Sequence, residues 1–123
     1  MLQMESKLRA CDNSGAKLIK CIHFFGGFDK KFGKEGDLML VSVRSIRFMR
    51  KVKKGQKCLA LIIRTKKKRV FKDGSSSFFG SNGAVLLNSK KRLLGSKIKG
   101  PVSKYLRKLK YMKILQLTGY LYF

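Results

Sequence analysis

The chain has 123 residues, and its 30 lysines and arginines against 6 aspartates and glutamates give a formal net charge of +24. Its content of 44% hydrophobic and 11% aromatic residues is too high for a disordered basic tail. A small fold with this charge repels itself unless a polyanion relieves the repulsion. Composition therefore favours a single folded domain that spans residues 1–123 and binds phosphate groups. It disfavours a free-standing acid–base enzyme.

The chain lacks the usual features of membrane, secreted and metal-binding proteins. No apolar run approaches the roughly 18 residues of a membrane helix. The first residues resemble neither a secretory signal nor an organellar leader. Cys11, Cys21 and Cys58 are widely spaced, and His23 is the only histidine. We therefore expect reduced, partly buried thiols, with no metal, cofactor, membrane contact or small-molecule substrate.

Short apolar or alternating segments up to residue 88 predict strands separated by glycine-rich turns. Met39, Val41 and Val43 alternate with more polar neighbours and predict one buried face. Asp73-Gly74 predicts a hairpin, because this dipeptide tolerates positive φ. Five or more short strands predict a mainly β fold built around a small closed barrel. The expected strands span residues 17–25, 37–46, 57–65, 69–72, 77–79 and 83–88.

The pattern changes at Gly100-Pro101, so the barrel is expected over residues 1–100 and helical segments with a tail over 101–123. Ser103 is the expected cap of a first short helix, with Leu106 and Leu109 on its apolar side. Met112 and Leu115 suggest a second short helix.

The acids are expected to form turns and to perform no catalysis. Asp12, Asp29, Glu35, Asp37 and Asp73 all lie in predicted turns, where such side chains accept backbone hydrogen bonds. None forms a carboxylate pair within one periodic element, and His23 has no partner for a triad. The protein is therefore predicted not to be an enzyme.

Basic residues gather in three clusters. A single cluster is usually a solvated face, but three clusters with almost no balancing acid favour nucleic acid. Six to ten phosphate contacts would lower affinity by about 10³–10⁵ between 50 and 200 mM salt. The first cluster comprises Arg44, Arg47, Arg50, Lys51, Lys53, Lys54 and Lys57, the second Arg64, Lys66, Lys67, Lys68, Arg69 and Lys72, and the third Lys90, Lys91, Arg92, Lys97 and Lys99.

Aromatic residues near these clusters are more often core residues than base-stacking residues. Phe28 and Phe32 are the best candidates for stacking on unpaired bases, because they lie in a loop bounded by glycines.

One spaced set of residues resembles a family signature. Ala60-Leu61-Ile62-Ile63 is followed after nine residues by Asp73-Gly74, after four by Phe79, and after two by Asn82. Val85-Leu86 completes the set two residues later. This pattern resembles the universal large-subunit ribosomal protein family numbered fourteen. Further matching segments lie in the same order at residues 12–16, 26–27, 36–37, 52–55, 64–67, 86–88 and 100–102.

The resemblance implies a five-stranded β-barrel with a short C-terminal helical part, and a structural role on large-subunit rRNA. The turn at Asn13 and Ser14 offers small polar groups, and Arg64 could hold phosphate with two parallel hydrogen bonds. The hairpin could carry Lys72 into an RNA groove. The residues expected to bind rRNA are Asn13, Ser14, Lys17, Arg44, Arg47, Arg50, Lys51, Lys53, Lys54, Arg64, Lys66, Lys67, Lys68, Arg69 and Lys72.

The same resemblance implies protein and RNA partners at the subunit interface. Ser96, Lys97 and Lys113 match a surface on which a ribosome-silencing factor docks in the family. The other implied partners are small-subunit rRNA across an intersubunit bridge and a neighbouring large-subunit protein numbered nineteen in bacteria.

The sequence departs from the family at Phe48-Met49-Arg50, where a Pro-x-Gly turn is usual. Lysine is used far more often than arginine, and Phe, Leu and Tyr are plentiful. This residue usage is typical of proteins encoded by AT-rich genomes. We therefore expect an organelle-encoded protein of the mitochondrial matrix, with bacterial cytoplasm or a plastid as alternatives.

The main alternative function is a free single-stranded RNA-binding β-barrel, which would need several exposed aromatics on one sheet face. Basic side chains on many sides would instead favour a ribosomal component.

Overall fold

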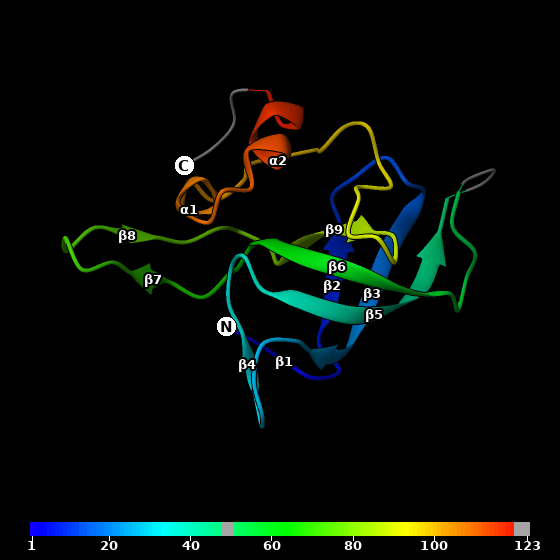
Figure 1. The fold of residues 1–123 in the computed structure, drawn as a ribbon, viewed down its shortest axis with the longest axis horizontal. Helices are drawn as coiled ribbons and strands as arrows, with labels where there is room; N and C mark the ends of the chain where they lie inside the picture. The colour runs from blue at the N-terminus through cyan, green and yellow to red at the C-terminus, as the bar shows by residue number, and fades with distance from the viewer. Residues whose placement is uncertain (48–50, 120–123) are drawn as a thin grey trace.

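The computed structural model describes residues 1–47 and 51–119 (Figure 1). It is mainly β, with a closed five-stranded barrel and two short helices near the C-terminus. The strands are β1 (Leu2–Gln3), β2 (Lys7–Ala10), β3 (Ala16–Phe24), β4 (Phe32–Gly33), β5 (Leu38–Ile46), β6 (Lys57–Arg64), β7 (Arg69–Val70), β8 (Ser76–Ser77) and β9 (Gly83–Leu87); the helices are α1 (Tyr105–Lys108) and α2 (Met112–Leu117).

The barrel runs in the order β2-β3-β5-β6-β9 and closes by pairing β9 with β2. All its neighbours are antiparallel except the closing pair, which is parallel and aligns Arg9 with Gly83. The predicted five-stranded barrel and the hairpin extension, β7–β8, are thus confirmed. The short strands β1, β2 and β4 were not predicted from the sequence.

Two apolar clusters share the strands β6 and β9. Met39, Val41 and Val43 of β5 point into the barrel and are buried, as their alternation predicted. On β6, Ala60 and Ile62 face the same interior, whereas Leu61 and Ile63 belong to a second cluster beneath the C-terminal segment. Both faces of β6 and β9 are therefore covered, which explains why their sequences are apolar without alternation.

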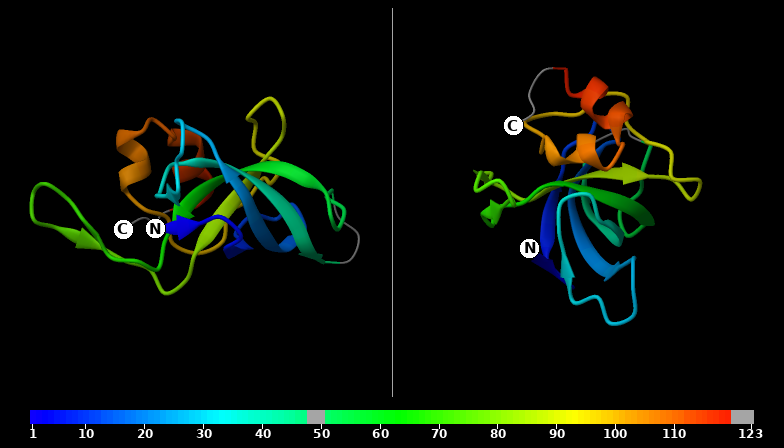
Figure 2. Two further views of the ribbon diagram at one scale, coloured as in Figure 1. Left: turned by 90° about the horizontal axis from the view of Figure 1, so that it is seen from below. Right: turned by 60° about the vertical axis from the view of Figure 1, so that its left-hand side comes forward.

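The C-terminal segment crosses the outside of β6 and β9, and its helices lie on that side of the barrel (Figure 2). Leu106 and Ile114 are buried in the second cluster. The expectation that Leu109 shares the buried side is wrong: α1 ends at Lys108, and Leu109 is exposed.

Ser103 does not cap α1, because Lys104 occupies the N-cap position and makes no side-chain capping bond. The Ser103 hydroxyl instead donates a 2.7 Å hydrogen bond to Glu35 Oε2. The sequence pattern was misleading because a buried carboxylate from a distant turn competes for this hydroxyl.

Glu35 is the centre of a buried junction. Its carboxylate also accepts a 3.3 Å hydrogen bond from Thr65 Oγ1, and Arg69 Nη1 lies 3.8 Å from Oε2. Three parts of the chain therefore meet at the turn before β5: the end of β6, the start of the hairpin, and the segment before α1. Glu35 lies in a turn as predicted, but its side chain contacts distant segments instead of the backbone of that turn.

The remaining acids divide into buried and exposed groups. Asp73 accepts hydrogen bonds from the backbone and hydroxyl of Ser75, which lower the pKa of its carboxyl. Asp37 accepts a 2.7 Å bond from the backbone N–H of Lys34. These two form turns as predicted. Asp12 differs, because it is buried and accepts the N–H of Leu86, far along the chain.

The three cysteines are free thiols, with Cys11 and Cys21 buried and Cys58 half-buried. Burial raises the pKa of all three, that of Cys21 to about 11. The thiols are consequently protonated and poorly reactive at neutral pH.

Replacing Glu35 with alanine removes the common acceptor of Thr65 and Ser103 and leaves Arg69 without its acid. We expect the free energy of unfolding to fall by about 3 kcal/mol, measured by urea denaturation in about 0.5 M KCl to screen the net charge. Asp29→Asn, which also removes one negative charge but from an exposed turn, should cost less than about 0.5 kcal/mol. Similar losses in both variants would contradict the junction.

Candidate nucleic-acid interface

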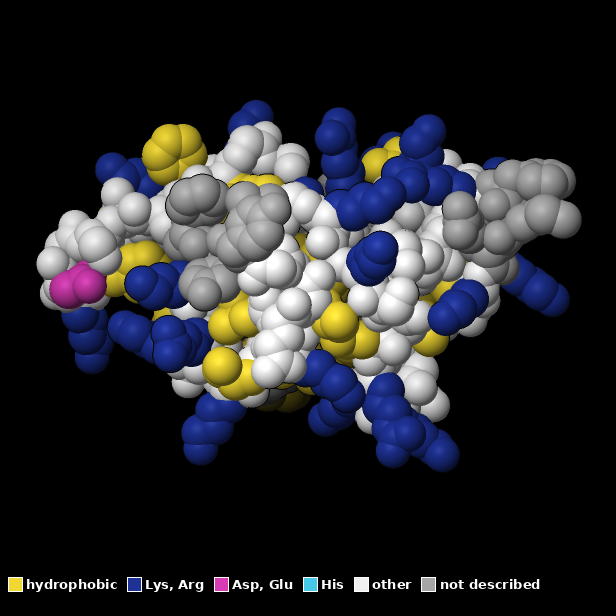
Figure 3. All heavy atoms as spheres, turned by 90° about the horizontal axis from the view of Figure 1, so that it is seen from above, with side chains coloured by type: hydrophobic (Ala, Val, Ile, Leu, Met, Phe, Trp, Pro, Cys, Tyr) yellow, Lys and Arg dark blue, Asp and Glu magenta, His cyan; other side chains and the backbone are white. Residues whose placement is uncertain are grey.

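Unpaired basic side chains dominate the described surface. Among residues 1–47 and 51–119, only Lys20, Lys30, Lys31 and Arg69 lie within 4.0 Å of an acidic group. Figure 3 shows lysines and arginines projecting around the whole outline of one face, with acidic side chains confined to one end. This distribution leaves most of the +24 charge available to an external polyanion.

The first basic cluster surrounds the loop between β5 and β6. Val52 is buried in the barrel interior and anchors this loop, so that Lys51, Lys53 and Lys54 remain exposed outside it. Gly55 (φ 84°) donates a 2.7 Å backbone bond to Val43, which turns the chain back into β6. Arg44, Arg47 and Lys57 are also exposed, and Lys17 is exposed on the neighbouring strand β3. Arg50 and the departure at 48–50 lie outside the described residues.

The second cluster divides into buried arginines and exposed lysines. Arg64 is only 9% exposed, and its Nη1 donates to the carbonyls of Lys99 (3.3 Å) and Pro101 (3.0 Å). The guanidinium that was expected to hold phosphate thus fixes the chain that leads to α1. Arg64 therefore contributes little to the exposed interface.

Arg69 is held in a similar way. Its guanidinium stacks 3.6 Å above the Tyr105 ring and 5.3 Å from the Phe71 ring, close to Glu35. This stacking ties the hairpin to α1. The exposed members of the second cluster are Lys66, Lys67, Lys68 and Lys72.

The turn at Asn13 shapes the chain around Ser96. Asn13 Oδ1 accepts the backbone N–H groups of Ser96 (2.7 Å) and Lys97 (3.2 Å), and its Nδ2 donates to Ser96 Oγ (2.9 Å). The structure thus brings together residues that were expected to serve two different sites. Asn13 remains exposed, but its amide is largely used in positioning Ser96 and Lys97.

Ser14 is fully buried, and its hydroxyl donates a 2.7 Å bond to Asp12 Oδ1. Burial raises the pKa of Asp12, although the hydrogen bonds from Ser14 and Leu86 favour the charged carboxylate. Ser14 therefore stabilises the turn at residues 12–15 through this buried hydrogen bond, and its hydroxyl is not part of the exposed surface.

The two largest basic regions lie far apart. Figure 1 shows the hairpin β7–β8 extending from one end of the long axis and the β5–β6 loop at the opposite end. The exposed phenylalanines of the described residues fall in two regions: Phe25, Phe28 and Phe32 lie at or near the β3–β4 loop, and Phe78 follows β8. Phe24 and Phe79 are buried. In Figure 1 the β5–β6 loop, which carries the first basic cluster, lies away from both the β3–β4 loop and the hairpin.

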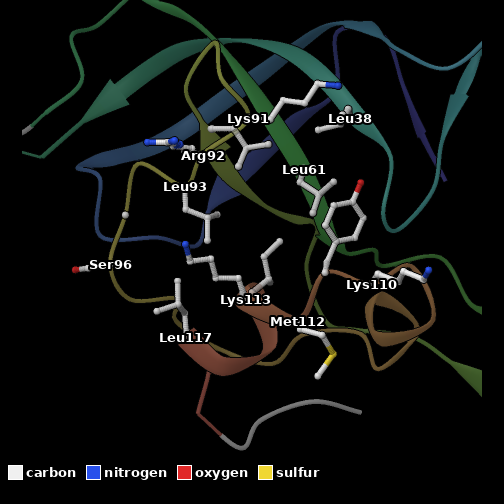
Figure 4. A pocket seen from close by; sticks show the side chains of 14 residues that line it. Leu38, Leu61, Lys91, Arg92, Leu93, Ser96, Lys110, Met112, Lys113 and Leu117 are labelled. Atoms are coloured by element: carbon white, nitrogen blue, oxygen red, sulfur yellow. The ribbon is translucent and has the colours of Figure 1, made fainter.

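An apolar groove of about 660 Å³ lies between α2 and the chain after β9 (Figure 4). Leu61, Leu93 and Leu117 turn toward this space, and Ser96 and Lys110 lie on opposite sides of it. Lys113 also lines the groove, whereas Lys97 lies outside its lining. The groove itself was not predicted, and the only sequence signal was the pair Leu93-Leu94 in an otherwise basic segment.

Within residues 1–47 and 51–119, no group of three histidine, cysteine or acidic side chains could hold a metal ion. No described helix has the length and apolarity needed to cross a membrane.

The comparison with known families agrees with this geometry. The family described as ribosomal protein L14p/L23e matches residues 1–121, almost the entire chain. Members of this family are structural ribosomal proteins and not enzymes. The barrel, the signature residues of β6 and β9 and the match over residues 1–121 lead to one conclusion: the chain belongs to the ribosomal protein L14p/L23e family, a structural constituent of the large ribosomal subunit.

Proposed function

We propose that the protein binds large-subunit rRNA through exposed basic side chains at both ends of its long axis. The observation that carries this proposal is the separation of the β5–β6 loop from the hairpin, each with lysines that have no acidic partner in the part of the chain that the structure describes. Such separated charges suit an extended RNA surface, because each cluster can meet a different backbone segment. The proposed contacts are Lys17, Arg44, Arg47, Lys51, Lys53, Lys54, Lys66, Lys67, Lys68 and Lys72.

This arrangement argues against a free single-stranded RNA-binding barrel. Such a barrel needs stacking aromatics in one basic groove. The exposed phenylalanines instead lie on two extensions of the fold. Phe25, Phe28 and Phe32 lie near lysines that are paired with acids, and Phe78 lies on the hairpin. Membership in a ribosomal protein family favours the structural role further.

The groove beside α2 supports a proposed role at the subunit interface. Its leucine-lined floor and the basic rim of Lys91, Arg92, Lys110 and Lys113 suit an amphipathic protein element with acidic flanks. We assign this groove, which Ser96 helps to line, and the neighbouring Lys97 to a ribosome-silencing factor. The neighbouring protein of the type numbered nineteen and small-subunit rRNA across a bridge are further proposed partners at this interface.

We also propose that the ribosome in question is mitochondrial. The support is compositional: lysine is used far more than arginine, and phenylalanine is abundant. Bacterial cytoplasm and plastids remain the alternatives.

Sedimentation of the source cell's ribosomes tests the role and the compartment together. We expect mass spectrometry to find the protein in large-subunit and monosome fractions of a mitochondrial lysate. The same peaks only in bacterial or plastid ribosomes would overturn the compartment, and recovery only in light, RNA-poor fractions would overturn the role.

Charge reversal of Lys53 and Lys54 to glutamate should lower recovery in the large-subunit fractions on the order of tenfold, because two phosphate contacts become repulsive. The double replacement by arginine keeps the charge and should be recovered like the wild type. Full recovery of the glutamate variant would show that this loop does not contact rRNA in the particle.

Lys97→Glu combined with Lys113→Glu should leave incorporation into large subunits unchanged. We expect the ratio of joined ribosomes to free large subunits to fall about threefold, which corresponds to less than 1 kcal/mol. The matched variant with arginine at both positions should join normally. Loss of the glutamate variant from large subunits would contradict the assignment of these lysines to the exposed interface.

A further inference from the structure

One end of the barrel exposes a group of apolar side chains. The loop between β3 and β4 projects beyond the barrel, at the lower edge of Figure 1 and of the right-hand view of Figure 2. Phe28 lies in this loop with a relative exposure of 105%, so its ring makes almost no contact with the rest of the fold. We call the following side chains the Phe28 surface: Met4, Ile22, Phe25, Phe28 and Phe32, all of them exposed.

Backbone pairing brings the members of the Phe28 surface together. Gln3 is aligned with Phe32 in the β1–β4 ribbon, which places Met4 next to that pair. The N–H of Glu5 donates a 2.9 Å bond to the carbonyl of Cys21, the neighbour of Ile22. Residues from the turn between β1 and β2, from β3, from the β3–β4 loop and from β4 therefore share one region.

Acidic residues are concentrated in the same region. Lys20 pairs with Glu5 (3.4 Å), Lys30 with Asp37 (2.9 Å) and Lys31 with Asp29 (3.7 Å). The fourth described ion pair is the one at the buried Glu35 junction. Half of the chain's 6 acids thus neutralise lysines around the Phe28 surface, whereas the basic loops elsewhere keep their charges free.

The loop that carries Phe28 is well braced. Lys30 Nζ donates a 3.3 Å bond to the Phe25 carbonyl in addition to its ion pair with Asp37. The Phe25 N–H donates a 3.0 Å bond to Leu38, and Gly26 and Gly27 have φ of 108° and 139°, which favour glycine. A loop already held in one shape loses little entropy when its aromatic side chain binds a partner.

We propose that the Phe28 surface binds another protein of the large subunit, through an apolar, weakly charged pocket on that protein that receives the Phe28 ring. This inference rests on the proposed role in the ribosome. An RNA partner would gain from free cations, but here Lys20, Lys30 and Lys31 are paired with carboxylates that repel phosphate. An exposed aromatic surrounded by balanced charges instead matches a protein interface, with an apolar centre and a polar rim.

Site-specific photocrosslinking in assembled particles tests this proposal. The photoreactive residue p-benzoylphenylalanine replaces Phe28 in one variant and Phe78 in a control, which is 69% exposed on the basic hairpin. Both positions are exposed, so neither replacement disturbs the core. Gradient-purified large subunits and monosomes are irradiated, and the adducts are identified after digestion with nuclease and protease.

We expect the Phe28 variant to form an adduct with one protein of the large subunit and none with nucleotides, whereas the hairpin control should yield nucleotide adducts. Nucleotide adducts at position 28, or no adduct there in either particle, would overturn the proposal while leaving the ribosomal role intact. Absence of the unmodified protein from large-subunit fractions would overturn the proposed function, and this inference with it.

Discussion

The carboxylate of Glu35 connects the barrel to everything that follows it in the chain. It accepts hydrogen bonds from Thr65 at the end of β6 and from Ser103 before α1, and it lies beside the Arg69 guanidinium at the start of the hairpin. A buried carboxylate needs such partners, because its transfer from water is costly without them. The orientations of the hairpin and of the C-terminal segment therefore both depend on one short turn before β5. The same junction therefore positions both the basic hairpin β7–β8 and the groove beside α2.

Two of the arginines complete this arrangement and are largely withdrawn from the surface. Arg64 donates to carbonyls of Lys99 and Pro101, and Arg69 stacks on Tyr105. The planar guanidinium suits both tasks, since it can donate in several directions and lie flat on a ring. The lysines are left on the loops, where a flexible stem and a compact charge suit contact with a phosphate backbone. The protein thus uses some of its basic residues for contacts within the fold and leaves others exposed.

The long strands of the barrel and the Asp73-Gly74 hairpin could be predicted because their signals are local: alternation, apolar runs and turn residues. The strand β2 could not, because only Leu8 of its four residues is buried and its pairing partners are distant. The roles of Ser103 and Ser14 were missed for a related reason, since each hydroxyl bonds a buried acid that local sequence does not reveal as buried. The lysines of the basic clusters are largely exposed, as their sequence pattern indicated. The groove beside α2 has no local pattern, because its leucines come from β5, β6, β9, the chain after β9 and α2.

The parallel pairing of β9 with β2 also determines when the barrel can form. The closing contacts join residues 9 and 10 of β2 to residues 83 and 84 of β9. One edge of β2 therefore stays unpaired until more than half of the chain has been synthesised. During synthesis, the early strands form at most an open sheet whose edges lack partners. The crowded positive charges of the β5–β6 loop oppose compaction in that interval. Closure of the barrel therefore depends on a long-range contact, and an anionic surface that binds this loop would favour closure by relieving the repulsion.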